Sequence, residues 1–450
     1  PFFSALRHLS QDRETILELT EKYVGRKNPV GKKILWFTDT VSDLNGVSVT
    51  LGKFRAQSEK RDLNITFVTC LPELEKTGQK NGHLLYLPCI ESLTPDFYTA
   101  YTLNFPSLLA SMEMIYHYRP DRIIISTPGP VGLLGMTMAG MLGIECTAIY
   151  HTDFAAQAKY IFRDETIAGL IQSAINRFYS FSTHIKVPTK EYISILEQQN
   201  YDVAKMSVFK RGITVPVLNV NPSWKDDFRK LLNLEKGFTL LWAGRVSKDK
   251  NIEFLLDLFD KAGQTIPDLN LVLCGSGPDL EYYQKKCRHL SRIHFAGFVE
   301  NHHLRRYYEF ADLFVFPSTT DTFGMVVLEA QSCGLPAMVT DIGGPQEIVN
   351  DRKTGFVLSL SSISVWVQRI EEIHTLKMNN PNEFAMMRAR CQHHVSENFN
   401  WDEALYDILG ECTSIREMKP RKHPGRSMKN QLQECAGSSD VPIFSTKVVA

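Results

Sequence analysis

The chain has 450 residues, of which 43% are hydrophobic and 22% charged, as expected for a soluble globular protein with room for two domains. Lys and Arg together number 50, as do Asp and Glu, so the overall charge gives no sign of a nucleic-acid or polyanion partner. The nine cysteines never stand in Cys-x-x-Cys spacing, which argues against a zinc site and favours unpaired thiols in a reducing, cytoplasmic setting.

The first segment, residues 1–30, is predicted to be a helical lead-in. Ser10 can cap a helix whose apolar face includes Leu19 and Tyr23. The chain begins at Pro1 rather than Met, and we therefore expect it to be an excised or processed piece of a longer chain.

An N-terminal α/β lobe is predicted over residues 31–215. Short apolar runs bounded by polar residues, the pattern of buried parallel strands, recur along it. They cover residues 33–38, 64–70, 84–87, 122–126, 146–150 and 184–188. Helical patterns lie between several of these runs, and this alternation is typical of a doubly wound, Rossmann-like domain.

One stretch of this lobe, residues 123–144, carries no charge and is a candidate membrane span. Residues 128–130, which read Pro-Gly-Pro, divide it into an apolar run and a segment rich in Gly, Ala and Met. A span needs about 20 unbroken apolar residues, so the pattern favours a strand, a turn and a buried helix.

A second lobe of the same kind is predicted over residues 216–400. Its strands are expected at residues 238–243, 270–274, 293–295, 313–316 and 337–340. The proline-containing residues 215–224 form the predicted hinge, and the fold class is therefore α/β with two Rossmann-like lobes and a cleft between them. In such sheets ligands bind at the carboxyl ends of the strands.

Beyond the second lobe, residues 401–418 form one more predicted helix. Its apolar face carries Ala404, Leu405, Ile408 and Leu409. Residues 419–450 are basic, contain prolines and Gly/Ser-rich sequence, and are predicted to be mostly disordered.

The second lobe opens with a charged loop over residues 244–251, between a predicted strand and a predicted helix. Gly244 starts the loop, Arg245 can grip phosphate oxygens with its planar guanidinium, and Lys250 adds a point charge. Lys248, in contrast, is interpreted as a surface residue. Two fixed cations facing a diphosphate would stabilise it as a leaving group.

Two further turns follow strands of this lobe. Gly275 and Gly277 form a Gly-Ser-Gly-Pro turn that lacks the third glycine and the following acidic residue of a dinucleotide fingerprint. We interpret it as a tight turn lining a nucleotide. Phe298 follows another strand, where backbone groups could contact the base.

The most informative segment is residues 321–329, Asp-Thr-Phe-Gly-Met-Val-Val-Leu-Glu. Thr322 is predicted to cap a helix, and Gly324 lets a ligand approach the backbone. The start of such a helix presents free N–H groups and a partial positive charge, which suit a diphosphate. Glu329, about two turns on, could reach ribose hydroxyls. Together these features predict a nucleotide-sugar site.

The first lobe supplies fewer candidates. Gly46 precedes a helical pattern in a loop after the first strand, and His151 ends another strand, where it would face the cleft. No Asp-x-Asp motif, nucleophile elbow or phosphate loop occurs, so no metal-dependent diphosphate grip is expected.

The order of these motifs resembles that of the retaining, GT-B-fold glycosyltransferases of family 4, the "glycosyl transferases group 1". The matching positions are Gly244-Arg245…Lys250, Gly275-Ser276-Gly277-Pro278, Pro317-Ser318, Phe323-Gly324…Glu329-Ala330 and Gly343-Gly344…Glu347. Two positions differ, since Asp321 stands for the usual Glu and Asn251 for a Gly. The resemblance implies that the helix over residues 401–418 crosses back to the first lobe.

The resemblance also implies roles. Arg245 and Lys250 would bind the donor diphosphate, Glu329 would hold the ribose, and Asp321 and His151 would lie at the transferred sugar. Backbone groups of Phe323, Gly324 and Met325 would face phosphate and sugar, with Gly46, Gly244, Gly275, Gly277 and Phe298 completing the donor site.

The implied reaction moves a hexose from a UDP- or GDP-sugar to a hydroxyl acceptor with retention of configuration and no cofactor. The expected acceptor is a glycolipid or polysaccharide precursor. The motif variants at residues 151–154 and 320–324 are similar to those of bacterial lipid-glycosylating enzymes. A nucleotide-sugar 2-epimerase of the same fold and a catalytically silent sugar-nucleotide-binding module are the alternatives.

Contact with a membrane lipid stays open at this stage. Lys53, Arg55 and the adjoining residues 60–61 are basic, and residues 160–163 are aromatic and basic, so either segment could rest on the cytoplasmic face of a bilayer. Ordinary helix faces are the favoured interpretation of both segments.

Overall fold

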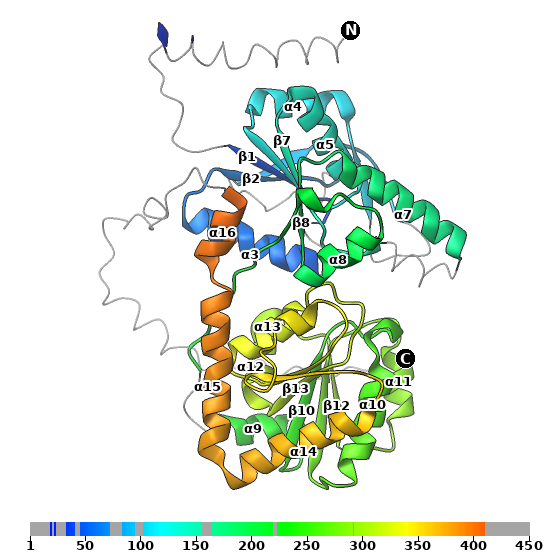
Figure 1. The fold of residues 1–450 in the computed structure, drawn as a ribbon, viewed down its shortest axis with the longest axis vertical. Helices are drawn as coiled ribbons and strands as arrows, with labels where there is room; N and C mark the ends of the chain where they lie inside the picture. Colours follow the sequence, from blue (N-terminus) through cyan, green and yellow to red (C-terminus); the bar gives the residue numbers. More distant parts are fainter. Residues whose placement is uncertain are drawn as a thin grey trace.

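The computed structural model describes residues 19, 22–23, 33–40, 46–72, 83–94, 102–154, 164–218, 223–290 and 292–409, and shows two α/β lobes, one above the other (Figure 1). Each lobe is built on its own parallel sheet, which confirms the two predicted Rossmann-like lobes. The predicted tail over residues 419–450 lies outside the described residues, as does the lead-in over residues 1–30 apart from residues 19, 22 and 23.

The sheet of the first lobe has the strand order β3-β2-β1-β6-β7-β8-β9 and is parallel throughout. Its strands are β1 Ile34–Phe37, β2 Ile65–Cys70, β3 Leu84–Leu87, β6 Arg122–Ile125, β7 Glu145–Ile149, β8 His184–Val187 and β9 Met206–Val208. All but β9 were predicted to within one residue at each end. The antiparallel ribbon of β4 Cys89–Leu93 and β5 Leu103–Pro106 was not predicted.

Helices cover both faces of this sheet. They are α3 Gly46–Lys60, α4 Leu108–Tyr118, α5 Pro130–Leu142, α7 Glu165–Ser180 and α8 Lys190–Gln198, with a short 3₁₀ turn η2 at Val203–Lys205. Alternate side chains of β1 point to opposite faces: Ile34 and Trp36 pack in one core cluster, and Leu35 and Phe37 in another. A strand buried on both faces reads as a continuous apolar run, which explains why the pattern was recognisable.

The uncharged stretch over residues 123–144 consists of β6 and α5, as predicted. Pro130 occupies the first turn of α5 and Gly143 ends it in a left-handed conformation. Among the described residues, no helix is both long enough and apolar enough to cross a membrane.

The second sheet has the order β12-β11-β10-β13-β14-β15 and is also parallel. Its strands are β10 Phe238–Ala243, β11 Leu269–Cys274, β12 Ile293–Gly297, β13 Leu313–Phe316, β14 Ala337–Thr340 and β15 Gly355–Leu358, the last not predicted. The helices are α9 Ser223–Leu231, α10 Ile252–Gly263, α11 Leu280–Lys286, α12 Asn301–Phe310, α13 Met325–Ser332, α14 Ile363–Asn379 and α15 Pro381–Asn398, with 3₁₀ turns η3 Lys248–Lys250 and η4 Gly344–Glu347.

The chain crosses between the lobes twice, and the two crossings lie side by side. After α15, the helix α16 Trp401–Leu409 packs on the first lobe, where Trp401 contacts Phe54 edge to face (Figure 1). The backbone N–H of Ile213 in the first crossing donates to the carbonyl of Phe399 in the second, at 2.9 Å. A crossover helix is therefore present, although residues 410–418 of the predicted helix lie outside the described residues.

The predicted hinge over residues 215–224 extends too far. Helix α9 begins at Ser223, so Trp224 is helical and packs against Phe228. The two prolines suggested a longer hinge, but the apolar side of α9 packs in the core of the second lobe, with Phe228 buried there.

Candidate active site between the two lobes

The candidate site lies where the strand order of the second sheet reverses. Strand β10 is flanked by β11 on one side and by β13 on the other, and the loops after β10 and β13 therefore border the crevice that binds ligands in open α/β sheets. Arg245 and Lys250 follow β10, while Asp321 and Gly324 follow β13. The structure thus brings these four predicted site residues to one edge of the sheet.

The cations of this edge are already paired with carboxylates. Lys250 Nζ lies 2.8 Å from Asp321 Oδ2 and 3.5 Å from Asp249 Oδ2, and Arg245 Nη2 lies 3.6 Å from Asp249 Oδ1. Burial acts to raise the pKa of Asp249, but Lys250 and other partners including Arg245 outweigh it, so this pKa is lower than usual. Asp249 was not among the predicted site residues, because nothing in the sequence shows that it turns back onto Arg245.

The two predicted cations differ in exposure. The Lys250 side chain is 14% exposed and that of Arg245 is 42% exposed. Lys248, interpreted from the sequence as a surface residue, is exposed, and its backbone N–H donates to Asp279 Oδ2 at 2.9 Å. Of the two predicted cations, Arg245 is therefore the more accessible to an arriving anion.

Helix α13 begins at the crevice in a different way from that predicted. Gly324 occupies the N-cap position with φ of 90°, a left-handed conformation that glycine adopts without strain, and no side chain caps the helix. The predicted Thr322 cap is wrong, because the Thr322 hydroxyl donates to the His151 carbonyl of the first lobe at 2.7 Å. The first N–H groups of α13 thus receive no side-chain cap, as an anion site requires.

Glu329, in the second turn of α13, contacts the first lobe. Its Oε1 accepts from Lys53 Nζ of α3 at 2.7 Å, and Tyr308 Oη lies 3.4 Å from its Oε2. The Glu329 side chain is 16% exposed. A cation of the first lobe therefore occupies the carboxylate that the sequence assigned to the ribose.

The predicted glycines have a packing role that the structure makes plain. A Cβ on Gly275 would lie 1.8 Å from the Gly244 carbonyl oxygen, and one on Gly277 would lie 2.3 Å from the Val246 carbonyl oxygen. These glycines let the loops after β10 and β11 touch backbone to backbone. Phe298, after β12, is exposed, and its place in the donor site stays a prediction.

The Gly343-Gly344 turn supports the acidic loop from behind. The Gly344 N–H donates to the Asp321 carbonyl at 3.0 Å, and a Cβ on Gly344 would lie 2.0 Å from the Thr322 carbonyl oxygen. Close by, Glu347 Oε1 accepts from the backbone N–H of Glu191 at the start of α8, at 2.8 Å. This turn therefore both shapes the loop and binds the first lobe.

His151 lies two residues after the end of β7, at the seam between the lobes, but its ring is buried. Nε2 is 3.3 Å from Ser126 Oγ, and the ring meets Phe209 edge to face. Burial, followed by the charge of Arg211, lowers the pKa of His151 to about 3. The imidazole is neutral at physiological pH, and the contact with the second lobe is made by its carbonyl.

Gly46 is the first residue of α3, and a Cβ added there would meet nothing within 4 Å. Packing within the described residues therefore does not require a glycine at this position. Residues 41–45, which complete the predicted loop, lie outside the described residues.

Asp39, after β1, is a buried carboxylate whose structural role the sequence analysis did not predict. Asp39 accepts from the Val131 N–H at 2.8 Å and from Thr127 Oγ1 at 2.6 Å, so it caps α5 from another strand. Burial raises the pKa of Asp39 to about 6 against these hydrogen bonds. A Cβ on Gly129 would lie 2.5 Å from the Asp39 carboxyl carbon, which explains the glycine in the Pro-Gly-Pro turn.

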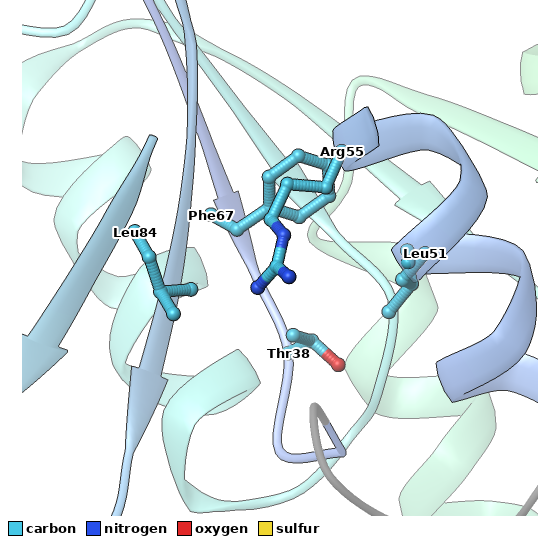
Figure 2. Close-up of a pocket in the computed structure, with 6 residues that line it drawn as sticks. Thr38, Leu51, Arg55, Phe67 and Leu84 are labelled. Atoms are coloured by element: carbon cyan, nitrogen blue, oxygen red, sulfur yellow. The ribbon is translucent and has the colours of Figure 1, made fainter. Parts of the chain in front are cut away.

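A small pocket of about 50 Å³ lies elsewhere in the first lobe, between α3 and the strands β1, β2 and β3. The guanidinium of Arg55 points into it, with Leu84 on one side and Leu51 on the other, and Phe67 also lines the pocket (Figure 2). The pocket has room for a water molecule or two and contains none of the predicted donor residues.

The basic residues of α3 are partly occupied within the chain. Lys53 pairs with Glu329, and Arg61, just after the helix, pairs with Asp402 of α16 at 2.8 Å. These partners weaken the interpretation of α3 as a bilayer-binding face. The other candidate segment, residues 160–163, lies outside the described residues.

Two parallel α/β lobes and a helix that returns to the first lobe are the architecture of the GT-B fold. Residues 224–388 match the family model described as "Glycosyl transferases group 1". This match covers less than half of the chain and agrees with the resemblance of its motifs to those of the group 1 glycosyltransferases.

Comparison with known proteins agrees with this resemblance. Sulfoquinovosyl transferase SQD2 of Arabidopsis thaliana is 27% identical over 305 residues, or 66% of this chain and 57% of the plant protein. The alpha-monoglucosyldiacylglycerol synthase of Streptococcus pneumoniae is 23% identical over 329 residues, or 71% of this chain and 73% of that protein. Several of the curated relatives are matched over little more than half of their own length.

Among solved structures, Anabaena HepE in complex with UDP and glucose matches 84% of this chain and 98% of its own, with a TM-score of 0.63 at 17% identity. At this level of identity the likeness establishes the GT-B fold. The hydrogen bonds and ion pairs of individual residues are therefore taken from the structure of this chain.

Proposed function

We propose that the chain is a retaining glycosyltransferase that moves a hexose from a UDP- or GDP-sugar to a hydroxyl acceptor. The observation that carries the proposal is the convergence of Arg245, Lys250 and Asp321 at the switch point of the second sheet, beside the uncapped start of α13. Glu329 lies on the same helix, roughly 7 Å further along its axis. This spacing suits a ligand with a sugar, a diphosphate and a ribose in line.

The charges support a diphosphate leaving group. When the bond between the anomeric carbon and the phosphate oxygen breaks, negative charge grows on the diphosphate, and Arg245 together with Lys250 stabilises it. The diphosphate competes with Asp321 and Asp249 for these cations. Its binding would free the Asp321 carboxylate for a hydroxyl of the transferred sugar.

A reaction that retains the configuration in this way needs no protein side chain as the general base. In the mechanism that the family resemblance implies, the departing phosphate helps to take the proton of the acceptor hydroxyl on the same face of the sugar. His151 is an unsuitable base in this arrangement, because its ring is buried and its pKa is about 3. Closure of the lobes over the donor would exclude water and limit hydrolysis.

For the acceptor, we propose a lipid-linked or glycan hydroxyl presented to the first lobe. The name of the relative from S. pneumoniae refers to a glucosylated diacylglycerol, which favours a lipid acceptor and a peripheral position on a cytoplasmic membrane face. Sedimentation with anionic vesicles at low and high salt tests this part, and a chain that stays in the supernatant at both argues for an aqueous glycan acceptor.

A panel of nucleotide sugars tests the reaction. We expect one UDP- or GDP-sugar to raise the melting temperature and to be turned over only when an acceptor is added. Isomerisation of the donor without acceptor would instead identify a 2-epimerase. Donor binding without any turnover would identify a silent binding module.

A further inference from the structure

Arg211 is a buried cation in the first crossing between the lobes, and the sequence analysis did not single it out. Only 5% of the residue is exposed. Its Nη1 donates to the carbonyls of Pro188 and Phe209 at 3.2 and 3.4 Å. Burial lowers the pKa of Arg211 to about 9, so it keeps its charge at neutral pH.

The guanidinium of Arg211 lies between two aromatic rings. Its central carbon is 4.0 Å from the ring centroid of Phe323 in the second lobe and 5.0 Å from that of Phe209. A desolvated cation–π contact contributes about 2 kcal/mol. Phe323 directly precedes Gly324, the N-cap residue of α13. By contacting Phe323, Arg211 therefore helps to fix the position at which α13 begins.

The backbone around Arg211 is held tightly. A Cβ on the next residue, Gly212, would lie 2.5 Å from the Trp401 ring, so this crossing passes directly against the returning one. The Phe323 ring in turn meets Phe399 of the returning crossing, with centroids 6.2 Å apart. Arg211 therefore sits at the point where both crossings and the loop before α13 meet.

The same charge acts on His151. After burial, Arg211 is the group that lowers the pKa of this histidine. The His151 carbonyl accepts from Thr322, the neighbour of Phe323, so one short segment of the second lobe contacts His151 and Arg211 through adjacent residues.

We propose that Arg211 is a positioning residue of the transfer reaction, which holds Phe323 and thereby aligns the start of α13 with the sugar-facing edge of the first lobe. The inference rests on the proposed function, since alignment matters only if a donor spans the two lobes. Arg211 acts through Phe323 and need not touch the donor.

The test compares kcat and donor KM of the variants Arg211→Met, Arg211→Lys and Phe323→Leu with those of the wild type. Arg388→Met is the matched control, because Arg388 also donates to two backbone carbonyls, those of Ala311 and Glu309, but touches none of the predicted site residues. Melting temperatures are recorded for all variants.

For Arg211→Met we expect kcat/KM to fall by about tenfold or more, since a misplacement of about 1 Å can cost about 100-fold. Arg211→Lys keeps the charge and should recover part of the loss, whereas Arg388→Met should lower the melting temperature and leave kcat/KM within about twofold of the wild type. The double variant Arg211→Met/Phe323→Leu should be no worse than the poorer single variant, because the two residues act as one unit.

Equal kcat/KM losses in Arg211→Met and Arg388→Met, or losses of Arg211→Met and Phe323→Leu that multiply, would overturn the inference. The wild type is assayed first. A wild type without transfer and without stabilisation by UDP or GDP overturns the proposed function and this inference with it, while an active wild type with an unaffected Arg211→Met overturns the inference alone.

Discussion

The two lobes share an architecture but contribute to the candidate site in different ways. In the second lobe, each group of site residues comes from one short segment, such as residues 244–250 or 321–329, that follows a strand of the sheet. In the first lobe, Lys53, Arg211 and the His151 carbonyl reach the site singly, through contacts with partners far along the chain. The second lobe therefore carries its site as local motifs, and the first lobe completes it by tertiary contact.

The largest effects should come from the second lobe. We expect Arg245→Ala and Glu329→Ala each to raise the activation barrier by roughly 2–4 kcal/mol, because each removes a charge that faces the donor in the proposed function. Steady-state transfer assays measure this, with Lys248→Ala as the control from the same loop. Near-normal turnover in both variants would remove the basis for the donor site.

A first-lobe variant with a smaller effect is Gly46→Ala. A Cβ at this position meets nothing within 4 Å, so the melting temperature should be nearly unchanged. If donor phosphates approach this backbone, donor KM should rise by about tenfold, which corresponds to about 1.4 kcal/mol of binding free energy. Gly140→Ala, on α5 and equally unhindered, is the control and should leave KM unchanged. An unchanged KM in both variants would separate Gly46 from the donor.

Lys53→Met sharpens the comparison further, because Lys53 belongs to one lobe and its partner Glu329 to the other. Removing the cation frees the carboxylate for ribose, so we expect UDP or GDP to bind about threefold to fivefold more tightly, in line with about 1 kcal/mol for a part-exposed ion pair. Isothermal titration calorimetry measures the change. Arg61→Met, which breaks the pair with Asp402 instead, is the control. Weaker binding in Lys53→Met would show that Lys53 itself contacts the nucleotide.

The smallest expected effect concerns Asp39 and pH. Its folded-state pKa of about 6 lies above the ordinary 3.8, so the folded chain binds the proton more tightly than the unfolded chain. This contribution is therefore fully present below pH 4 and is lost as the pH rises through 6. Between pH 7 and pH 5 the melting temperature of the wild type should rise relative to that of Asp39→Asn. Parallel pH profiles of the two proteins would contradict this assignment.

Much of the fold was predictable because it depends on local patterns. Strands buried on both faces, such as β10 and β13, are continuous apolar runs, and their bounds were predicted without error. The ribbon of β4 and β5 escaped notice because its strands are short and partly exposed. The Thr322 cap was wrong for another reason: local chemistry allowed it, but a carbonyl of the other lobe took the hydroxyl.

For the candidate site, the sequence alone was sufficient to group the predicted second-lobe residues, because they stand close together after strands whose carboxyl ends must share an edge. Only the tertiary structure shows which charges meet: Lys53 with Glu329 across 276 positions, Asp39 with the start of α5, and Arg211 with Phe323. Hydrophobic periodicity specifies which face of a helix or strand is buried. The pairing of single polar groups depends instead on how distant segments, and the two lobes, pack against each other.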